Sequence, residues 1–159
     1  MKSPLRRLTT LVLCTFATLL AQTARANDPE AVFQDARIVH NVTVNGQKGF
    51  RVHAKFVVKY GLHNPCKMIA YFHYETGAKL KTGDSRYSDT GGNVSVARSF
   101  SPDYDPAYYN DFQLFVPHSA LNMARGNQYD LKFRLQLYDV AAKRFFGTSG
   151  WYHFHLKMP

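Results

Sequence analysis

The sequence predicts an all-β fold, a single-domain antiparallel β-sandwich of seven to eight strands. Apolar residues recur at every second position over short stretches, the spacing of a strand with one buried face. Turns rich in glycine, asparagine and proline interrupt these stretches at short intervals. No stretch has the apolar spacing of an amphipathic helix of useful length. Short strands spaced in this way are typical of sandwiches, and a closed barrel is the alternative.

The first half of the domain shows the alternation most clearly. Residues 32–44 are expected to form one or two strands, and residues 45–49 a turn with glycines available for positive φ. Residues 50–60 are apolar at even positions and mostly polar at odd ones, so one face should meet a core and the other water. Residues 66–75 are apolar on both faces, which predicts a strand in the middle of a sheet.

The second half is predicted from the same spacing. The elements expected there are a strand at 93–100, a loop at 101–111, a strand at 112–116, a helical turn within 117–123, a strand at 129–138 and a last strand at 145–156. Strict alternation in 129–138 predicts that Phe133 and Leu135 are buried while Lys132 and Arg134 are exposed.

Residues 1–26 are predicted to be a signal peptide, and residues 27–159 the β-sandwich domain. Three of the first seven residues are basic, residues 8–20 are mostly apolar but short for a membrane span, and Ala24-Arg25-Ala26 fits a signal-peptidase site. We therefore expect a protein that starts at Asn27, has no transmembrane segment, and is periplasmic or secreted.

Charge and cysteine content limit the kinds of partner. Residues 27–159 contain sixteen Lys or Arg and eleven Asp or Glu, a net charge of +5. This moderate excess is typical of a solvated basic face, and we expect no nucleic-acid partner. Cys14 lies in the predicted signal, so Cys66 is the only cysteine left and cannot form an internal disulfide. A buried free thiol is expected, with an intermolecular disulfide or a reactive thiol as alternatives.

No catalytic or metal-binding motif stands out. His153 and His155 share one face of a strand, a spacing that can bind zinc or copper, but the sequence supplies no third or fourth ligand. Ser149 lacks the setting of a nucleophile elbow. Calcium is left open, because several aspartates lie in predicted loops, where they also suit ordinary turns: Asp84, Asp89, Asp103, Asp105 and Asp111. We expect no enzyme activity, no cofactor and no bound metal.

The predicted loop at 101–111 is the candidate binding site. It places Tyr104, Tyr108 and Tyr109 beside Asp103 and Asp105. Two prolines restrict the loop, which lowers the entropy lost on binding, and tyrosine rings with a polar tip are good anchors. We expect these residues to contact a protein partner or an envelope polymer; the oligomeric state is open.

Four stretches carry a resemblance to a known family. They are NGQKGFRVHAKF at 45–56, AYF at 70–72, DFQLFVP at 111–117 and YDLKF at 129–133. Together they resemble an uncharacterised bacterial β-sandwich module that is found alone or appended to caspase-like peptidases and repeat proteins. The resemblance spans nearly all of residues 27–159. It implies an accessory or interaction role and carries over no catalytic residue.

Three hypotheses for function follow. The leading one is an exported protein-interaction or accessory module, favoured by the aromatic content and the lack of catalytic groups. The second is a domain that binds carbohydrate or an envelope polymer through Trp151 and the three loop tyrosines. The third, an enzyme of unknown type, is the least favoured.

Overall fold

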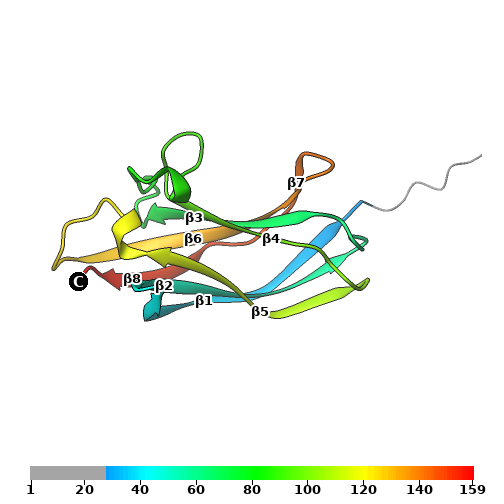
Figure 1. Ribbon diagram of the computed structural model, residues 1–159, viewed down its shortest axis with the longest axis horizontal. Coiled ribbons are helices and arrows are strands. Elements are labelled where there is room, and N and C mark those ends of the chain that lie inside the picture. Colours follow the sequence, from blue (N-terminus) through cyan, green and yellow to red (C-terminus); the bar gives the residue numbers. More distant parts are fainter. Residues whose placement is uncertain (1–27) are drawn as a thin grey trace, which may run out of the picture.

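Two antiparallel sheets packed face to face form the domain, as the computed structural model shows (Figure 1). The structure describes residues 28–159. The predicted signal peptide at 1–26, with Cys14, lies outside the described residues, so export stays a prediction. Within residues 28–159, no helix is long and apolar enough to cross a membrane.

The two sheets contain three and five strands. The smaller sheet has the order β1-β2-β5, with β1 at Glu30–Val44, β2 at Gln47–Lys59 and β5 at Ala107–Pro117. The larger sheet has the order β4-β3-β6-β7, and β8 also pairs with β6. Its strands are β3 at Cys66–Tyr74, β4 at Ser95–Phe100, β6 at Gln128–Asp139, β7 at Arg144–Thr148 and β8 at Tyr152–Lys157. The predicted all-β sandwich is therefore confirmed, with eight strands.

Short 3-10 turns are the only helical elements of the described residues. They are η1 at Ser85–Tyr87 and η2 at His118–Ala120. The second lies within the helical turn predicted for 117–123, which is thus confirmed. As predicted, β3 lies inside its sheet, between β4 and β6.

The core lies between the sheets and is rich in aromatic rings. Phe50 and Phe56 from β2 are fully buried, and so are Phe72 from β3 and Phe133 from β6. The rings of Phe50 and Phe72 meet edge to face across the two sheets at 5.7 Å between centroids. The predicted alternation in β2 and β6 therefore places its apolar residues as expected.

The predicted exposure of Lys132 and Arg134 is wrong in degree, because both side chains are half-buried. They lie against the ring of Trp151, with Lys132 Nζ 5.3 Å and Arg134 Cζ 5.1 Å from its centroid. A tryptophan from the β7–β8 connection thus lies against the cationic ends of both side chains.

The predicted loop at 101–111 is also wrong at its second half, since β5 begins at Ala107. A β-bulge breaks the alternation in this part of the strand. Ala54 pairs with Phe112, but Phe56 pairs with Tyr109, so two residues of β5 lie opposite one residue of β2. The bulge turns Tyr109 and Phe112, three positions apart, toward the same core, and period-two reasoning cannot see that.

The single last strand predicted at 145–156 is wrong as well, because it is two strands, β7 and β8. Both pair with β6, β7 with its last residues and β8 with its first. Between them Ser149 bridges the gap: its Oγ accepts from the N–H of Leu135 at 2.9 Å, and its own N–H donates to the Leu135 carbonyl at 2.9 Å.

Candidate functional site

Three connections meet at one end of the sandwich, which we call the loop end. They are residues 60–65 after β2, residues 101–106 before β5, and residues 140–143 between β6 and β7. In Figure 1 they lie toward the right, where β1 begins. Backbone hydrogen bonds join them: His63 N–H donates to the Pro102 carbonyl at 2.7 Å, and Val140 N–H donates to the Pro65 carbonyl at 2.9 Å. The loops therefore form one connected surface.

Asp105 makes a further link between these loops. Its Oδ1 accepts from the backbone N–H of Tyr60 at 2.8 Å. Tyr60 and His63 both have positive φ, 57° and 59°, a conformation that residues other than glycine adopt only where their surroundings hold them. These links hold the loop end in a defined shape before any partner arrives, which lowers the entropy lost on binding.

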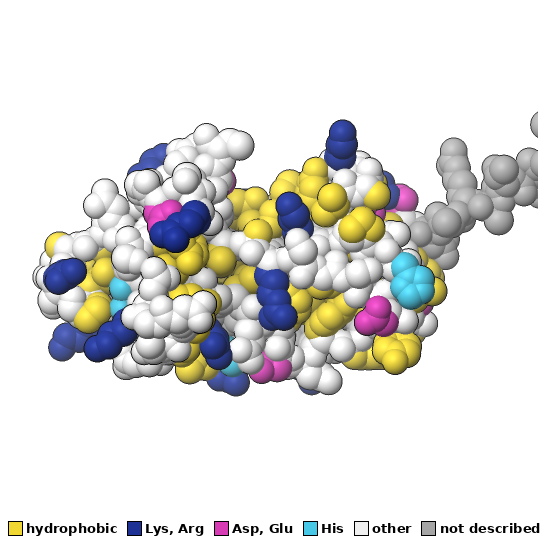
Figure 2. Space-filling view, viewed as in Figure 1, with side chains coloured by type: hydrophobic (Ala, Val, Ile, Leu, Met, Phe, Trp, Pro, Cys, Tyr) yellow, Lys and Arg dark blue, Asp and Glu magenta, His cyan; other side chains and the backbone are white. Residues whose placement is uncertain are grey.

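Large apolar side chains are exposed on this surface. Tyr104 is 75% exposed and Tyr108 67% exposed, and Leu62 on the neighbouring loop is 47% exposed. Tyr60 and Val140 are exposed beside them. Figure 2 shows hydrophobic side chains interspersed with acidic and histidine side chains toward this end of the molecule. Exposed apolar groups contributed by several loops to one surface are typical of an interaction site.

Tyr109 differs from its two predicted companions. Its ring stacks on Phe56 at 4.6 Å with an interplanar angle of 9°, and it meets the edges of Phe100 and Phe112. Burial raises the pKa of Tyr109 to about 12, with smaller contributions from Cys66 and Asp103. The ring is therefore part of the core. Of the three predicted tyrosines, the structure keeps Tyr104 and Tyr108 at the surface.

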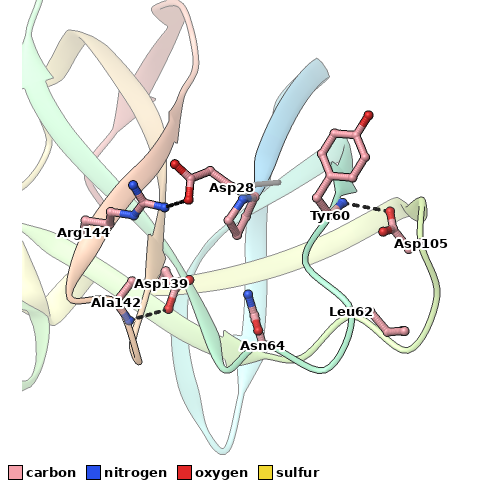
Figure 3. A pocket seen from close by; sticks show the side chains of 9 residues that line it. Asp28, Tyr60, Leu62, Asn64, Asp105, Asp139, Ala142 and Arg144 are labelled. Carbon is pink, nitrogen blue, oxygen red and sulfur yellow. Dashed lines mark hydrogen bonds and ion pairs between the residues drawn. The ribbon is translucent and has the colours of Figure 1, made fainter. Parts of the chain in front are cut away.

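An open cleft of about 480 Å³ lies beside these loops (Figure 3). Three carboxylates line it, and each already has a partner. Asp28 pairs with Arg144, whose pKa this bond raises; Asp105 accepts from Tyr60; and Asp139 accepts from the N–H of Ala142 at 2.8 Å. Each of these carboxylates therefore links two parts of the chain around the cleft.

The loop aspartates are spread over separate local contacts. Asp103 is exposed, whereas Asp84 bonds to Arg86 and Asp89 to Asn93. Asp111 accepts from His53 at 2.5 Å, on the outer face of the smaller sheet. Within residues 28–159, no three His, Cys, Asp or Glu side chains gather closely enough to hold a metal ion.

The histidine pair on β8 has acidic neighbours. His153 Nδ1 lies 2.9 Å from Glu75 Oε2, and His155 Nδ1 lies 2.6 Å from Asp130 Oδ1. Each imidazole thus faces its own carboxylate. Cys66 is a buried free thiol, as predicted, and burial raises its pKa to about 11. A thiol held neutral in this way is a poor nucleophile.

A second candidate surface surrounds Trp151 on the outer face of the larger sheet. Its ring is partly exposed; His73 meets it edge to face at 4.9 Å, and Lys132 and Arg134 lie over it. The sequence nominated Trp151 but not these neighbours, because the register that places Lys132 opposite His73 is a long-range pairing. The sequence did contain one signal for this surface, the basic residues Lys132 and Arg134 in the strand predicted at 129–138.

A scan of family models, a search of curated proteins and a search of solved structures find no match for this chain. The resemblance to the bacterial sandwich module therefore stays a prediction.

Proposed function

We propose that this protein is an exported interaction module that binds a protein partner at the loop end. The observation that carries the proposal is the set of exposed apolar side chains at this end: Tyr104 and Leu62 lie on loops that hydrogen bonds hold together, and Tyr108 lies at the start of β5. A prearranged apolar surface with a polar rim has the anatomy of a binding site.

Aromatic anchors support a protein partner in particular. Tyrosine offers a large contact area with few rotatable bonds and a hydroxyl for one directed hydrogen bond. Tyr104 directly precedes Asp105, which accepts a hydrogen bond from the backbone of Tyr60, and Tyr108 follows at the start of β5; both rings are exposed. The cleft of Figure 3, which Tyr60, Leu62 and Asp105 help to line, offers a recess for a partner side chain.

Export is the second part of the proposal and is supported by residues 1–26 alone. The n-region, the short apolar stretch and the Ala24-Arg25-Ala26 site have the order of a secretory signal. N-terminal sequencing of protein recovered from the producing cells should begin at Asn27, give or take a residue or two. Soluble cytoplasmic protein that retains Met1 would contradict export without affecting the loop-end proposal.

Affinity purification tests the partner. The tagged protein is isolated from envelope extract beside a Tyr104→Ser/Tyr108→Ser variant, which should stay folded because both rings are exposed. Tyr87→Ser makes the same chemical change away from the loop end and is the matched control. We expect the double variant to lose a partner that the wild type and the control retain. Retention of every partner by the folded double variant would contradict the proposal.

A carbohydrate or envelope polymer is the second candidate, and the surface around Trp151 favours it. An exposed indole with hydrogen-bonding side chains beside it can stack on a sugar ring and orient its hydroxyls. Affinity electrophoresis through gels containing a polysaccharide tests this candidate. We expect retardation of the wild type that Trp151→Ala abolishes; equal mobility of both in every polymer would contradict it.

A further inference from the structure

Large hydrophobic side chains are exposed mainly at the loop end. The described residues expose eight such side chains, and five of these lie on the three loops or at the start of β5. Val32 and Phe145 add two more, at the starts of β1 and β7, and only Trp151 lies away from these loops. In Figure 1 the loops and the starts of β1 and β7 lie toward the right. This concentration at one end of the domain is typical of a docking surface.

A row of side chains across the smaller sheet extends this apolar surface. The register places Val57 of β2 between Val32 of β1 and Tyr108 of β5. Its neighbours in β2, Phe56 and Val58, face the core, so Val57 points to the outer face of the sheet. It is nevertheless only 6% exposed. The apolar surface therefore continues from the loops onto the face of the sheet.

The loop end is acidic, although the domain as a whole is basic. Together with the strand ends beside it, the loop end comprises residues 28–32, 59–65, 101–108 and 139–145. These residues include five Asp or Glu and three Lys or Arg, a net charge of −2. The other described residues include six Asp or Glu and thirteen Lys or Arg, a net charge of +7. The acidic charge therefore coincides with the exposed apolar side chains.

Three of the five carboxylates are exposed and have no cationic partner. They are Glu30, Asp103 and Asp105, and no Lys or Arg among residues 28–159 forms an ion pair with them. The charge of Arg144 is already balanced, since its guanidinium pairs with Asp28. Two lysines, at positions 59 and 143, are then left against four carboxylates. The excess of negative charge is thus open to a partner.

Asp105 carries part of this charge into the cleft of Figure 3. Its Oδ1 accepts from the backbone N–H of Tyr60 at 2.8 Å, and an ionised carboxylate has further lone pairs for a second donor. In Figure 3 its carboxylate lies across the cleft from Asp139. Tyr60 and Leu62 also line the cleft, so its wall is partly apolar. A long side chain with an apolar stem and a cationic end fits such a recess.

We propose that the loop end binds a basic segment of its protein partner, in which Lys or Arg side chains lie among large apolar ones. One cationic side chain enters the cleft and meets Asp105, and apolar side chains pack on Tyr104, Tyr108 and Leu62. An acidic segment, or the anionic headgroups of a phospholipid bilayer, would meet like charge there. Charge complementarity therefore selects the partner, and apolar contact supplies the area.

This inference rests on the proposed function and names the chemistry of its partner. Selection from phage-displayed random peptides of about twelve residues tests it. Peptides are selected on the purified protein and counter-selected on the Tyr104→Ser/Tyr108→Ser variant. We expect the enriched peptides to carry a net charge of about +2 or more and several large apolar residues, when compared with the unselected library.

Titration with the most enriched peptide then tests the role of charge. Its Kd should rise about fivefold or more between about 50 mM and about 500 mM NaCl, because salt screens exposed charges. Asp103→Asn/Asp105→Asn should raise the Kd about fivefold or more, and an asparagine at position 105 still accepts from the Tyr60 N–H. The matched control is Glu75→Gln/Asp130→Asn, which removes two exposed carboxylates at the opposite end of the larger sheet and should leave the Kd unchanged.

Several outcomes overturn the inference. Enriched peptides that require the two tyrosines but are acidic or uncharged would refute the basic segment and leave the loop-end site standing. No enrichment, or equal binding to the protein and the tyrosine variant, would contradict the loop-end site itself. An equal loss of affinity in the control variant would remove the loop-end carboxylates as the cause. If the double asparagine variant does not fold, Asp103→Asn alone replaces it, and an unchanged Kd then counts against the inference.

Two measurements test other occupants of the loop end. Sedimentation velocity of the purified protein should show a monomer, and self-association that Tyr104→Ser/Tyr108→Ser abolishes would mean that a second copy of this chain docks there. Flotation with phosphatidylcholine vesicles should leave the protein unbound. Binding to the vesicles that the same variant abolishes would assign the surface to a membrane and overturn the inference.

Discussion

Tyr108 and Tyr109 are adjacent in sequence, yet the structure predicts opposite consequences for their substitution. Tyr108 is 67% exposed, whereas the Tyr109 ring stacks on Phe56 and meets Phe100 and Phe112 edge to face. Tyr109→Ser should therefore destabilise the fold and Tyr108→Ser should not. The reverse is expected of partner binding, which Tyr108→Ser should weaken.

The magnitude follows from these contacts. Truncating a fully buried aromatic side chain costs about 3–5 kcal/mol. Tyr109 is half-buried, which lowers this figure, but its loss removes three aromatic contacts from the bulged part of the smaller sheet. We expect a loss of about 2–4 kcal/mol for Tyr109→Ser, against a change within about 0.5 kcal/mol for the exposed Tyr108.

Urea unfolding measures both values, with the fluorescence of Trp151, the single tryptophan, as the signal. The slope of the free energy of unfolding against urea concentration is compared as well, because a different slope would indicate a changed denatured state. Similar losses at the two positions would mean that the register across the β-bulge is not the one described. A larger loss of stability for Tyr108→Ser than for Tyr109→Ser would mean that Tyr108, and not Tyr109, packs in the core.

Three further outcomes are expected. Phe133→Ala should cost about 3–5 kcal/mol by urea unfolding, because the ring is fully buried, and Lys132→Ala less than about 1 kcal/mol; equal costs would refute the alternation in β6. Burial and the neighbouring His40 lower the pKa of His118 below 6.5, so the folded state favours the neutral ring and loses stability as pH falls below that value; His118→Gln should lose less between pH 7 and pH 5, and an equal loss would remove this residue as the cause. The raised pKa of Cys66, about 11, predicts at least tenfold slower alkylation at pH 8 in the folded protein than in urea; equal rates would show the thiol to be accessible.

Local alternation was enough to predict the two-sheet architecture. In β2 and β6 the apolar positions of the sequence are the buried positions of the structure. The prediction failed where a strand departs from this alternation of buried and exposed residues. The bulge in β5 places Tyr109 and Phe112 in the core at a spacing of three, so the sequence assigned both Tyr109 and Ala107 to a loop.

The candidate site was predictable only in part. Tyr104 and Asp105 do lie in an end loop, as predicted, but the role of Asp105 as a link to Tyr60 depends on a contact between residues 45 positions apart. The cationic surface around Trp151 was missed for a similar reason. Its members come from β3, β6 and the β7–β8 connection, and no local pattern states which strands will be neighbours.

Site-specific photo-crosslinking in the producing cells tests the central claim most directly. A photoreactive amino acid is placed at Tyr104, on the loop end, and separately at Lys48, an exposed position in the β1–β2 hairpin. We expect a crosslinked product of one defined mass from position 104 and none of that mass from position 48. Crosslinks of equal yield from both positions, or a defined product from position 48 alone, would contradict a partner bound at the loop end.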